Sequence, residues 1–197
     1  DLFNKFEFSK ISTDNLFCFK KFLTENKFCN IPSSKKIKNL FELTDTILIA
    51  PNYKNNAQSF KNLEDIILIL KNMNKKVFLV SQMPNFYFKN NRTSIDQFYF
   101  KYNRLPNKFE LSNLEKEKFN LIPVSVEQIN NNLQILSKKY NLKLLDRKEL
   151  ICEEILKKCY ILTKSKNKIN IDSDHLSIAG AIFVGKRILQ LNWLNIN

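Results

Sequence analysis

The stretch TILIAPNYKNNAQSFKNLEDIILILKNMNKKVFLVSQMP, residues 46–84, decides the fold class of this chain. Its first part, residues 46–51, is a short continuous apolar run that ends at a proline, which is typical of a buried central strand. Residues 60–73 place apolar side chains three and four positions apart, as in an amphipathic helix. Residues 76–82 again have the pattern of a buried strand. A strand, a helix and a strand in this order predict a parallel sheet.

The alternation of helices and strands continues toward the carboxyl end. Helices are predicted over residues 110–119, 125–140, 147–156 and 177–192, and a third strand over 142–146. Ser125 and Gln128 form a capping box at the start of one of these helices. Residues 84–122 are a long polar and aromatic insertion. The predicted fold class is α/β: a single three-layer α/β/α domain over residues 1–197, with a mostly parallel, flavodoxin-like sheet.

Length and composition limit the possible classes of protein. The chain has 197 residues, of which 44% are hydrophobic, and this suits one domain with a real core. No apolar run approaches the ~18 residues of a membrane span. The chain begins with Asp1 and lacks a leader, which we interpret as a piece of a longer protein. Its two glycines, Gly180 and Gly185, cannot form a Rossmann, Walker A or G-x-S-x-G motif.

The formal net charge of +13 allows two interpretations. A strongly basic protein can bind a polyanion, such as nucleic acid or anionic lipid headgroups. However, the basic residues are nearly all lysines spread along the chain, and arginine, the preferred residue for bidentate phosphate and base contacts, is rare. We therefore favour a compositional origin of the charge and predict no nucleic-acid partner.

The four cysteines form two local pairs in the sequence, Cys18 with Cys29 and Cys152 with Cys159. Two small disulfide loops in an oxidising compartment would explain this pairing, and four buried thiols in a cytosolic protein are the alternative. Neither pair has C-x-x-C spacing, and the only histidine is remote from both pairs in the sequence. We therefore predict no metal site.

The densest group of potentially reactive residues is Asp-Ser-Asp-His-Leu-Ser-Ile-Ala-Gly-Ala, residues 172–181. A neutral histidine can accept a proton from a serine hydroxyl when its other ring nitrogen is held as a donor. Asp172, three residues earlier, could hold His175 in this way, with His175 as the general base toward a nucleophile elsewhere. Asp174 is a rival for the orienting role. In the alternative interpretation both aspartates are loop residues and His175 is a surface histidine.

The residues after His175 indicate how the loop joins the last helix. Ser177 is predicted to cap this helix at its amino end. The small pair Gly180 and Ala181 would let the helix pack close to the sheet.

At this point the sequence resembles a known family. Asp-x-Asp-His-Leu-Ser-x-x-Gly-Ala before a terminal helix resembles the last conserved block of the SGNH hydrolases. It resembles more narrowly the SGNH-type domain fused behind the membrane domain of acyltransferase family 3 proteins, such as O-antigen and other surface-polysaccharide O-acetyltransferases. The two cysteine pairs and the strand of residues 46–53, which ends in an aromatic residue, occur where that subgroup has similar features. The resemblance covers roughly residues 15–192.

The resemblance implies roles for particular residues. His175 would be the catalytic base and Asp172 its orienting carboxylate, and both cysteine pairs would be disulfides. Asn52 stands where the wider superfamily's G-x-N-D block has an oxyanion donor. Here this block reads Ala-Pro-Asn-Tyr, residues 50–53, so its glycine and aspartate are missing. A turn residue after a strand is the alternative for Asn52.

The family's Gly-Asp-Ser block, which contains the nucleophile, is absent because no glycine precedes Gly180. Either the chain lacks its amino end, including the first strand of the sheet, or the domain has lost its serine. We favour the first explanation, because the Asp1 start also points to missing residues. By itself the chain should not catalyse acyl transfer.

The resemblance implies an extracytoplasmic domain of a membrane-bound O-acyltransferase, tethered on the periplasmic side by a membrane domain outside this chain. The reaction would acetylate hydroxyls of a cell-surface polysaccharide or lipopolysaccharide through an acyl-serine. The membrane domain would deliver the acyl donor, and no metal or nucleotide cofactor would be needed.

Two other functions remain open. A non-catalytic glycan-binding module could keep the fold without the nucleophile. A basic nucleic-acid-binding protein would show strongly salt-dependent binding and free thiols. Within the insertion, aromatic residues are candidates for stacking on sugars, although such residues are more often part of a core. They are Phe86, Tyr87, Phe88, Phe98 and Tyr99.

Overall fold

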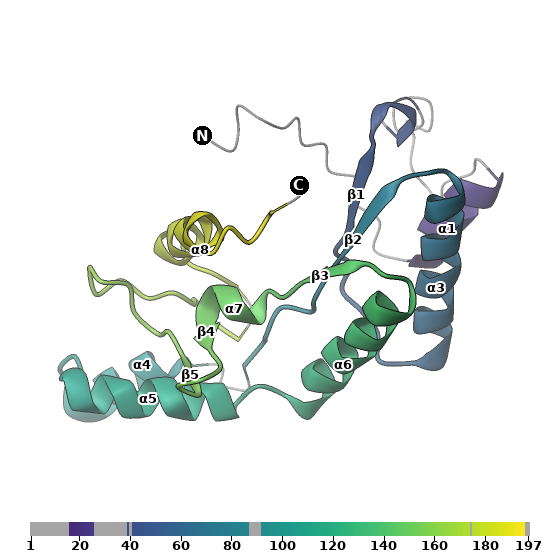
Figure 1. Ribbon diagram of the computed structural model, residues 1–197. Helices are drawn as coiled ribbons and strands as arrows, with labels where there is room; N and C mark the ends of the chain where they lie inside the picture. Colours follow the sequence, from purple (N-terminus) through teal and green to yellow (C-terminus); the bar gives the residue numbers. More distant parts are fainter. Residues whose placement is uncertain (1–15, 26–38, 40, 87–91, 174, 196–197) are drawn as a thin grey trace. The chain divides into compact units, whose positions relative to one another are not determined.

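The computed structural model describes residues 16–25, 39, 41–86, 92–173 and 175–195 (Figure 1). The described part divides between two compact units. One comprises Asp1–Leu79 with Gln134–Leu144, and the other comprises Val80–Leu133 with Leu145–Asn197. The interpretation of residues 1–197 as one SGNH-like domain stays a prediction.

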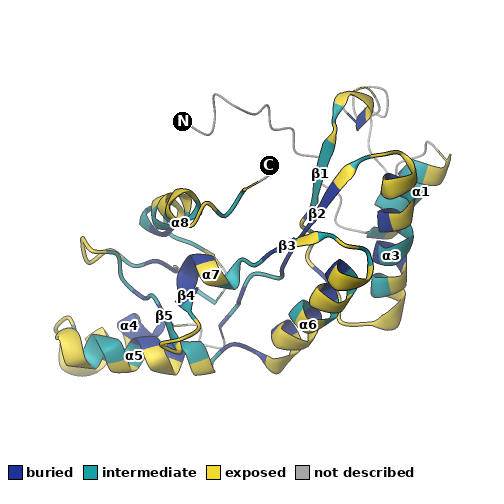
Figure 2. Ribbon diagram, viewed as in Figure 1, coloured by how far each residue is buried: buried dark blue, intermediate teal, exposed yellow. Residues whose placement is uncertain are grey.

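The predicted strand, helix and strand form the centre of the first unit. Strand β1 (Thr46–Ile49) pairs in parallel with β2 (Lys76–Val80), and the described sheet has the order β1-β2-β3, with β3 at Lys143–Leu145. This parallel sheet in a mixed α/β chain confirms the predicted fold class. One detail was wrong: within the described sheet the middle strand is β2, which is almost wholly buried, and β1 lies at an edge (Figure 2).

The crossover helix α3 (Ala57–Asn72) joins β1 to β2. Its N-cap, Asn56, accepts a hydrogen bond from the Ser59 N–H at 2.8 Å. One face of α3 is fully buried, and each of its large aliphatic side chains contributes roughly 1.5–3 kcal/mol by leaving water. This face consists of Leu63, Ile66, Ile67 and Leu70. Helix α1 (Leu16–Glu25) packs against α3, with Lys20 and Asp65 paired at 2.6 Å.

The insertion of residues 84–122 contains two helices where one was predicted. Helix α4 (Ser94–Tyr102) precedes α5 (Lys108–Asn120), and α6 (Val124–Lys139) follows. The predicted capping box at Ser125 was wrong, because Ser125 is already the second residue of α6. The Pro123 carbonyl instead accepts the N–H groups of Val126 and Glu127 at 3.0 and 3.3 Å.

The predicted helix over residues 147–156 was also wrong in extent. Helix α7 is only Lys148–Ile151. The chain then forms strand β4 (Cys152–Glu153), which pairs antiparallel with β5 (Lys158–Cys159). Cys152 and Cys159 face each other in this pair and form a disulfide. A strand pair closed by this disulfide is therefore found where the rest of the helix was predicted.

The disulfide lies inside a hydrophobic cluster of the second unit. Both cysteines are buried with four large apolar residues, Phe86, Ile122, Val126 and Ile151. Cys18 is also disulfide-bonded. Cys29 lies outside the described residues, so the pairing of Cys18 with Cys29 stays a prediction.

Replacing Cys152 and Cys159 together by alanine is expected to destabilise the fold by about 2–3 kcal/mol without abolishing it. The sequence separation is only 7, and the chain-entropy model gives a small loop a stabilisation of this size. Urea unfolding of the variant and the oxidised parent measures the difference. A variant that is unfolded at room temperature in the absence of urea would contradict the estimate.

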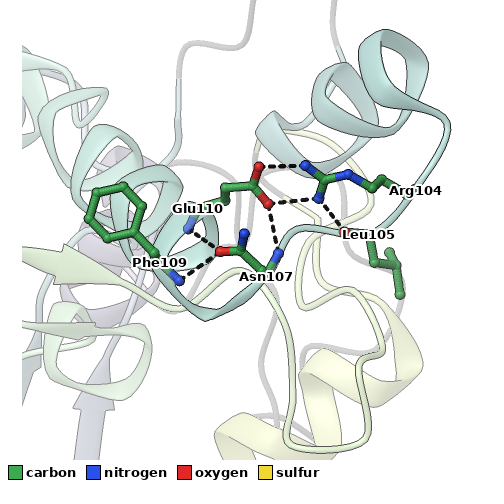
Figure 3. Close-up of polar contacts among 5 residues, drawn as sticks. All are labelled: Arg104, Leu105, Asn107, Phe109 and Glu110. Atoms are coloured by element: carbon green, nitrogen blue, oxygen red, sulfur yellow. Dashed lines mark hydrogen bonds and ion pairs between the residues drawn. The ribbon is translucent and has the colours of Figure 1, made fainter.

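A polar corner joins α4 to α5 (Figure 3). Asn107 caps α5 by accepting the N–H groups of Phe109 and Glu110, both at 3.0 Å, and the Glu110 carboxylate accepts the Asn107 N–H at 2.8 Å. This is a complete capping box. The guanidinium of Arg104 donates to both Glu110 oxygens, at 2.7 and 2.6 Å. Hydrogen bonds from Arg104 and the Asn107 backbone lower the pKa of the Glu110 carboxyl to about 2.

Stability should therefore depend on pH through Glu110. A carboxyl with a lowered folded-state pKa stabilises the fold above its unfolded-state pKa, near 4.5, and this stabilisation disappears as the pH falls toward about 2. The change in the free energy of unfolding is small, because the Arg104–Glu110 pair is open to solvent. Urea midpoints of the parent and Glu110→Gln should differ at pH 7 and converge at low pH. A difference between the two midpoints that stays the same at pH 7 and at low pH would contradict the assignment.

Candidate active site

The structure brings together Asp172 and His175, the two residues predicted as a catalytic pair. His175 Nδ1 lies 3.0 Å from each carboxylate oxygen of Asp172, and the His175 backbone N–H donates to Asp172 Oδ1 at 2.8 Å. The carboxylate is thus an acceptor for Nδ1–H. This tautomer leaves Nε2 as the proton acceptor, the arrangement that a general base needs.

The pair is open to solvent. The His175 side chain is 72% exposed and that of Asp172 is 38% exposed. Asp174, the rival for the orienting role, lies outside the described residues. The pair therefore lies at the surface of the described part of the chain rather than in its core.

Backbone hydrogen bonds hold the loop that carries the pair. The Ile171 N–H donates to the His175 carbonyl at 2.9 Å, and Asn170 and Leu176 form an antiparallel bridge. The Phe86 N–H donates to the Ser173 carbonyl at 2.8 Å, which ties the loop to the segment after β2. Asp172 and His175 therefore project from a short loop that is closed on itself.

Helix α8 (Ile178–Gln190) begins directly after this loop. Ser177 is its N-cap, as predicted, and accepts the Gly180 N–H at 2.9 Å. The predicted close approach at Gly180 also occurs, but against the backbone of Ile169 rather than the sheet: a Cβ on Gly180 would lie 2.0 Å from the Ile169 carbonyl oxygen. This contact fixes the start of α8 beside the base of the loop.

A buried lysine underlies the same loop. Lys118 of α5 is 2% exposed, and its Nζ donates to the Tyr160 carbonyl at 2.6 Å and to Asn170 Oδ1 at 2.8 Å. Burial lowers the pKa of the Lys118 ammonium to about 7, against the opposing attraction of Glu115. Burial also raises the pKa of the Glu115 carboxyl. The sequence does not indicate that Lys118 is buried, because α5 is a polar helix without a clear apolar stripe.

Asn52, the predicted oxyanion donor, follows β1 in the other compact unit, and its side chain is exposed. The next residue, Tyr53, is buried and donates its hydroxyl to the Ile49 carbonyl at 2.9 Å. The aromatic residue at the end of this strand is therefore a structural element. The role of Asn52 stays a prediction.

The aromatic candidates for sugar stacking divide into core and surface residues. Phe86 and Phe98 are buried, which fits a core role, whereas Tyr99 is 50% exposed. Tyr87 and Phe88 lie outside the described residues. Of the five, Tyr99 is the described residue that could present a ring face to a sugar.

The described residues contain neither a group of metal ligands nor a membrane-spanning helix. Among these residues, no three or more His, Cys, Asp or Glu side chains are grouped so that they could hold a metal ion. No helix in the described ranges is long and apolar enough to cross a membrane.

A histidine whose Nδ1 is held by a carboxylate is one part of the Ser-His-Asp arrangement used in acyl transfer. A family model described as the SGNH domain fused to AT3 domains matches residues 16–190. The chain therefore belongs to the SGNH domains of the kind that is fused to AT3 (acyltransferase family 3) domains, which confirms the resemblance seen in the sequence. A search of curated proteins finds no match to this chain.

Solved structures with a similar arrangement include two of low sequence identity. One is the periplasmic domain of a lipopolysaccharide acetyltransferase from Salmonella ser. Paratyphi A, at 12% identity and a TM-score of 0.49 over 75% of this chain and 56% of the other. The second is a proposed platelet activating factor from Streptococcus pneumonia, at 18% identity and a TM-score of 0.43 over 75% and 59%. The chain thus spans less than two thirds of either structure.

Proposed function

We propose that this chain is the extracytoplasmic SGNH domain of an O-acyltransferase that acetylates hydroxyls of a cell-surface polysaccharide or lipopolysaccharide. The observation that carries the proposal is the contact of His175 Nδ1 with both oxygens of Asp172. Membership of the AT3-fused SGNH family supports a parent protein that handles acyl groups. The Cys152–Cys159 disulfide supports an oxidising compartment, such as the periplasmic side of a membrane.

In the proposed reaction, a serine outside these 197 residues is the nucleophile. His175 Nε2 takes the proton of the serine hydroxyl as its oxygen attacks the acetyl carbonyl, and returns a proton to the leaving group of the donor. An acceptor hydroxyl then attacks the acyl-serine, with His175 again as base and then acid. Asp172 keeps Nδ1 protonated and stabilises the imidazolium that forms in each step.

The other participants follow from this scheme. The acyl donor reaches the serine from a membrane domain that also tethers this domain. The acceptor is a hydroxyl of a surface glycan. Asn52 is the proposed oxyanion donor, through its side-chain amide.

The test is the acetyl content of the surface glycan in cells that produce the full-length protein with His175→Ala. Acetylation should fall to the level of cells without the gene, because removal of the base stops both halves of the reaction. Ile178→Ala is the matched control: this side chain is three residues away and 85% exposed, and its loss should leave acetylation unchanged.

Full acetylation in the His175→Ala cells would overturn the proposal. It would favour the non-catalytic glycan-binding module, which is a candidate because this sequence contains no Gly-Asp-Ser block. Binding of the chain to the de-acetylated glycan, measured by calorimetry, would then be the next observation to make.

A further inference from the structure

The buried ammonium of Lys118 contacts two residues that anchor the loop of Asp172 and His175. Its Nζ donates to Asn170 Oδ1 at 2.8 Å and to the Tyr160 carbonyl at 2.6 Å, and it lies 4.4 Å from the centre of the Phe86 ring. A lysine is costly to bury, and an apolar side chain of the same size would fill the space without this cost. Packing alone therefore does not account for the buried ammonium group of Lys118.

Two of these partners are the residues that anchor the loop. Asn170 forms the bridge with Leu176 that closes the base of the loop. The Phe86 N–H donates to the Ser173 carbonyl, between Asp172 and His175. Lys118 thus contacts the anchor at the base and the residue that holds the tip.

The third partner connects the loop to a rigid part of the unit. Tyr160 follows Cys159 of the disulfide-closed strand pair, and its N–H donates to the Ile151 carbonyl at 2.9 Å.

A small cavity lies beside Lys118 and Asn170. Its other lining residues are Thr93, Ser94, Ile95 and Ile161. The cavity volume of about 10 Å³ is no larger than one water needs, so the space beside Nζ leaves no room for a substrate.

We propose that Lys118 is a positioning residue that fixes the Asp172–His175 pair by linking Asn170, at the base of the loop, to α5 and to the Tyr160 carbonyl. The inference rests on the proposed function only for its consequence for catalysis. The link itself is a property of this chain. Lys118 acts on the pair through its contacts with Asn170 and Phe86.

The test compares Lys118→Met with the parent in the 197-residue chain. Methionine fills a similar volume but cannot donate hydrogen bonds. Because His175 is the only histidine, the ¹⁵N signals of its imidazole report directly which ring nitrogen carries the proton. The parent should show the Nδ1–H form, whereas Lys118→Met should show a mixture of the two tautomers. Exchange of the Ile171 and Phe86 amide protons should become at least 10-fold faster.

Lys116→Met is the matched control, because it makes the same chemical change on the exposed side of α5. It should leave the imidazole signals and the exchange rates unchanged. A folded Lys118→Met chain with parental imidazole signals and parental exchange overturns the proposal. If Lys118→Met does not fold, Asn170→Ala decides: it removes the acceptor on the loop and leaves the bond of Lys118 to Tyr160, so unchanged imidazole signals would overturn the proposal as well.

A second readout separates this proposal from the proposed function. In the full-length protein, Lys118→Met should lower kcat for acyl transfer about 10-fold and leave KM for the acceptor unchanged, because the pair is displaced while the acceptor site is not. If the imidazole signals change in Lys118→Met while His175→Ala cells acetylate normally, the positioning role stands and the proposed function fails. If His175→Ala abolishes acetylation and Lys118→Met alters neither readout, the proposed function stands and the positioning role fails.

Discussion

Replacing Asp172 with Asn in the full-length protein is expected to lower the rate of acyl transfer about 10³-fold or more. The substitution preserves size and shape, and an asparagine oxygen can still accept the His175 backbone N–H, which Asp172 Oδ1 accepts at 2.8 Å. The structural support of the loop is therefore retained. What changes is the side-chain contact with His175 Nδ1.

The physical reason is the tautomer of His175. Both carboxylate oxygens lie 3.0 Å from Nδ1, so an ionised Asp172 can only accept from Nδ1–H. An asparagine amide group directed at Nδ1 donates a hydrogen bond to it and favours the form with Nε2–H. A histidine in this form cannot take a proton from a serine, and the charge that stabilised the imidazolium is also lost.

Two measurements check this prediction. The transfer rate of the purified full-length protein gives the size of the loss, with Ser173→Ala as the control from the same loop. Imidazole ¹⁵N signals of the 197-residue chain give its cause, since Asp172→Asn should shift His175 toward the Nε2–H form. A rate within threefold of the parent would show that Asp172 does not orient the base, and it would direct attention to Asp174.

The sequence was sufficient to predict the elements that long apolar patterns define. The strands at Thr46–Ile49 and Lys76–Val80 and the helix at Ala57–Asn72 lie where their patterns predicted, because burial on one or both faces imposes a clear period. The helix predicted over 147–156 was wrong in extent, because its apolar residues support a helical period only weakly: Ile151 and Ile155 are four residues apart, but Leu150 lies off this face. The local pairing of Cys152 with Cys159 overrides this weak propensity.

The candidate site could be predicted only in part. Asp172 and His175 are three residues apart, so a single turn brings them together, and the longer motif of residues 172–181 marked them as a candidate pair. Lys118 is 52 residues from Asn170 in the sequence, and within the polar helix α5 it cannot be told apart from exposed lysines such as Lys116. Such a contact exists only after the whole unit has folded, and no local pattern reports it.

Replacing Gly180 with Ala is expected to destabilise the fold by about 3 kcal/mol. The added Cβ would lie 2.0 Å from the Ile169 carbonyl oxygen and 2.8 Å from its carbonyl carbon. Both atoms belong to the backbone, so no side chain can rotate away. The same Ile169 oxygen accepts the Ser177 N–H at 2.9 Å, and α8 can therefore move away only by breaking its own N-terminal anchor.

The other glycine of the chain supplies the control for this prediction. Gly185 also lies within α8, but a Cβ there would meet nothing within 4 Å. Helix propensity alone makes Gly185→Ala stabilising by roughly 0.5–1 kcal/mol. Urea unfolding of the two variants should therefore give free-energy changes of opposite sign for the same substitution in the same helix. Equal stabilisation by both variants would mean that α8 does not approach Ile169 this closely, and the loop of Asp172 and His175 would lose one of its supports.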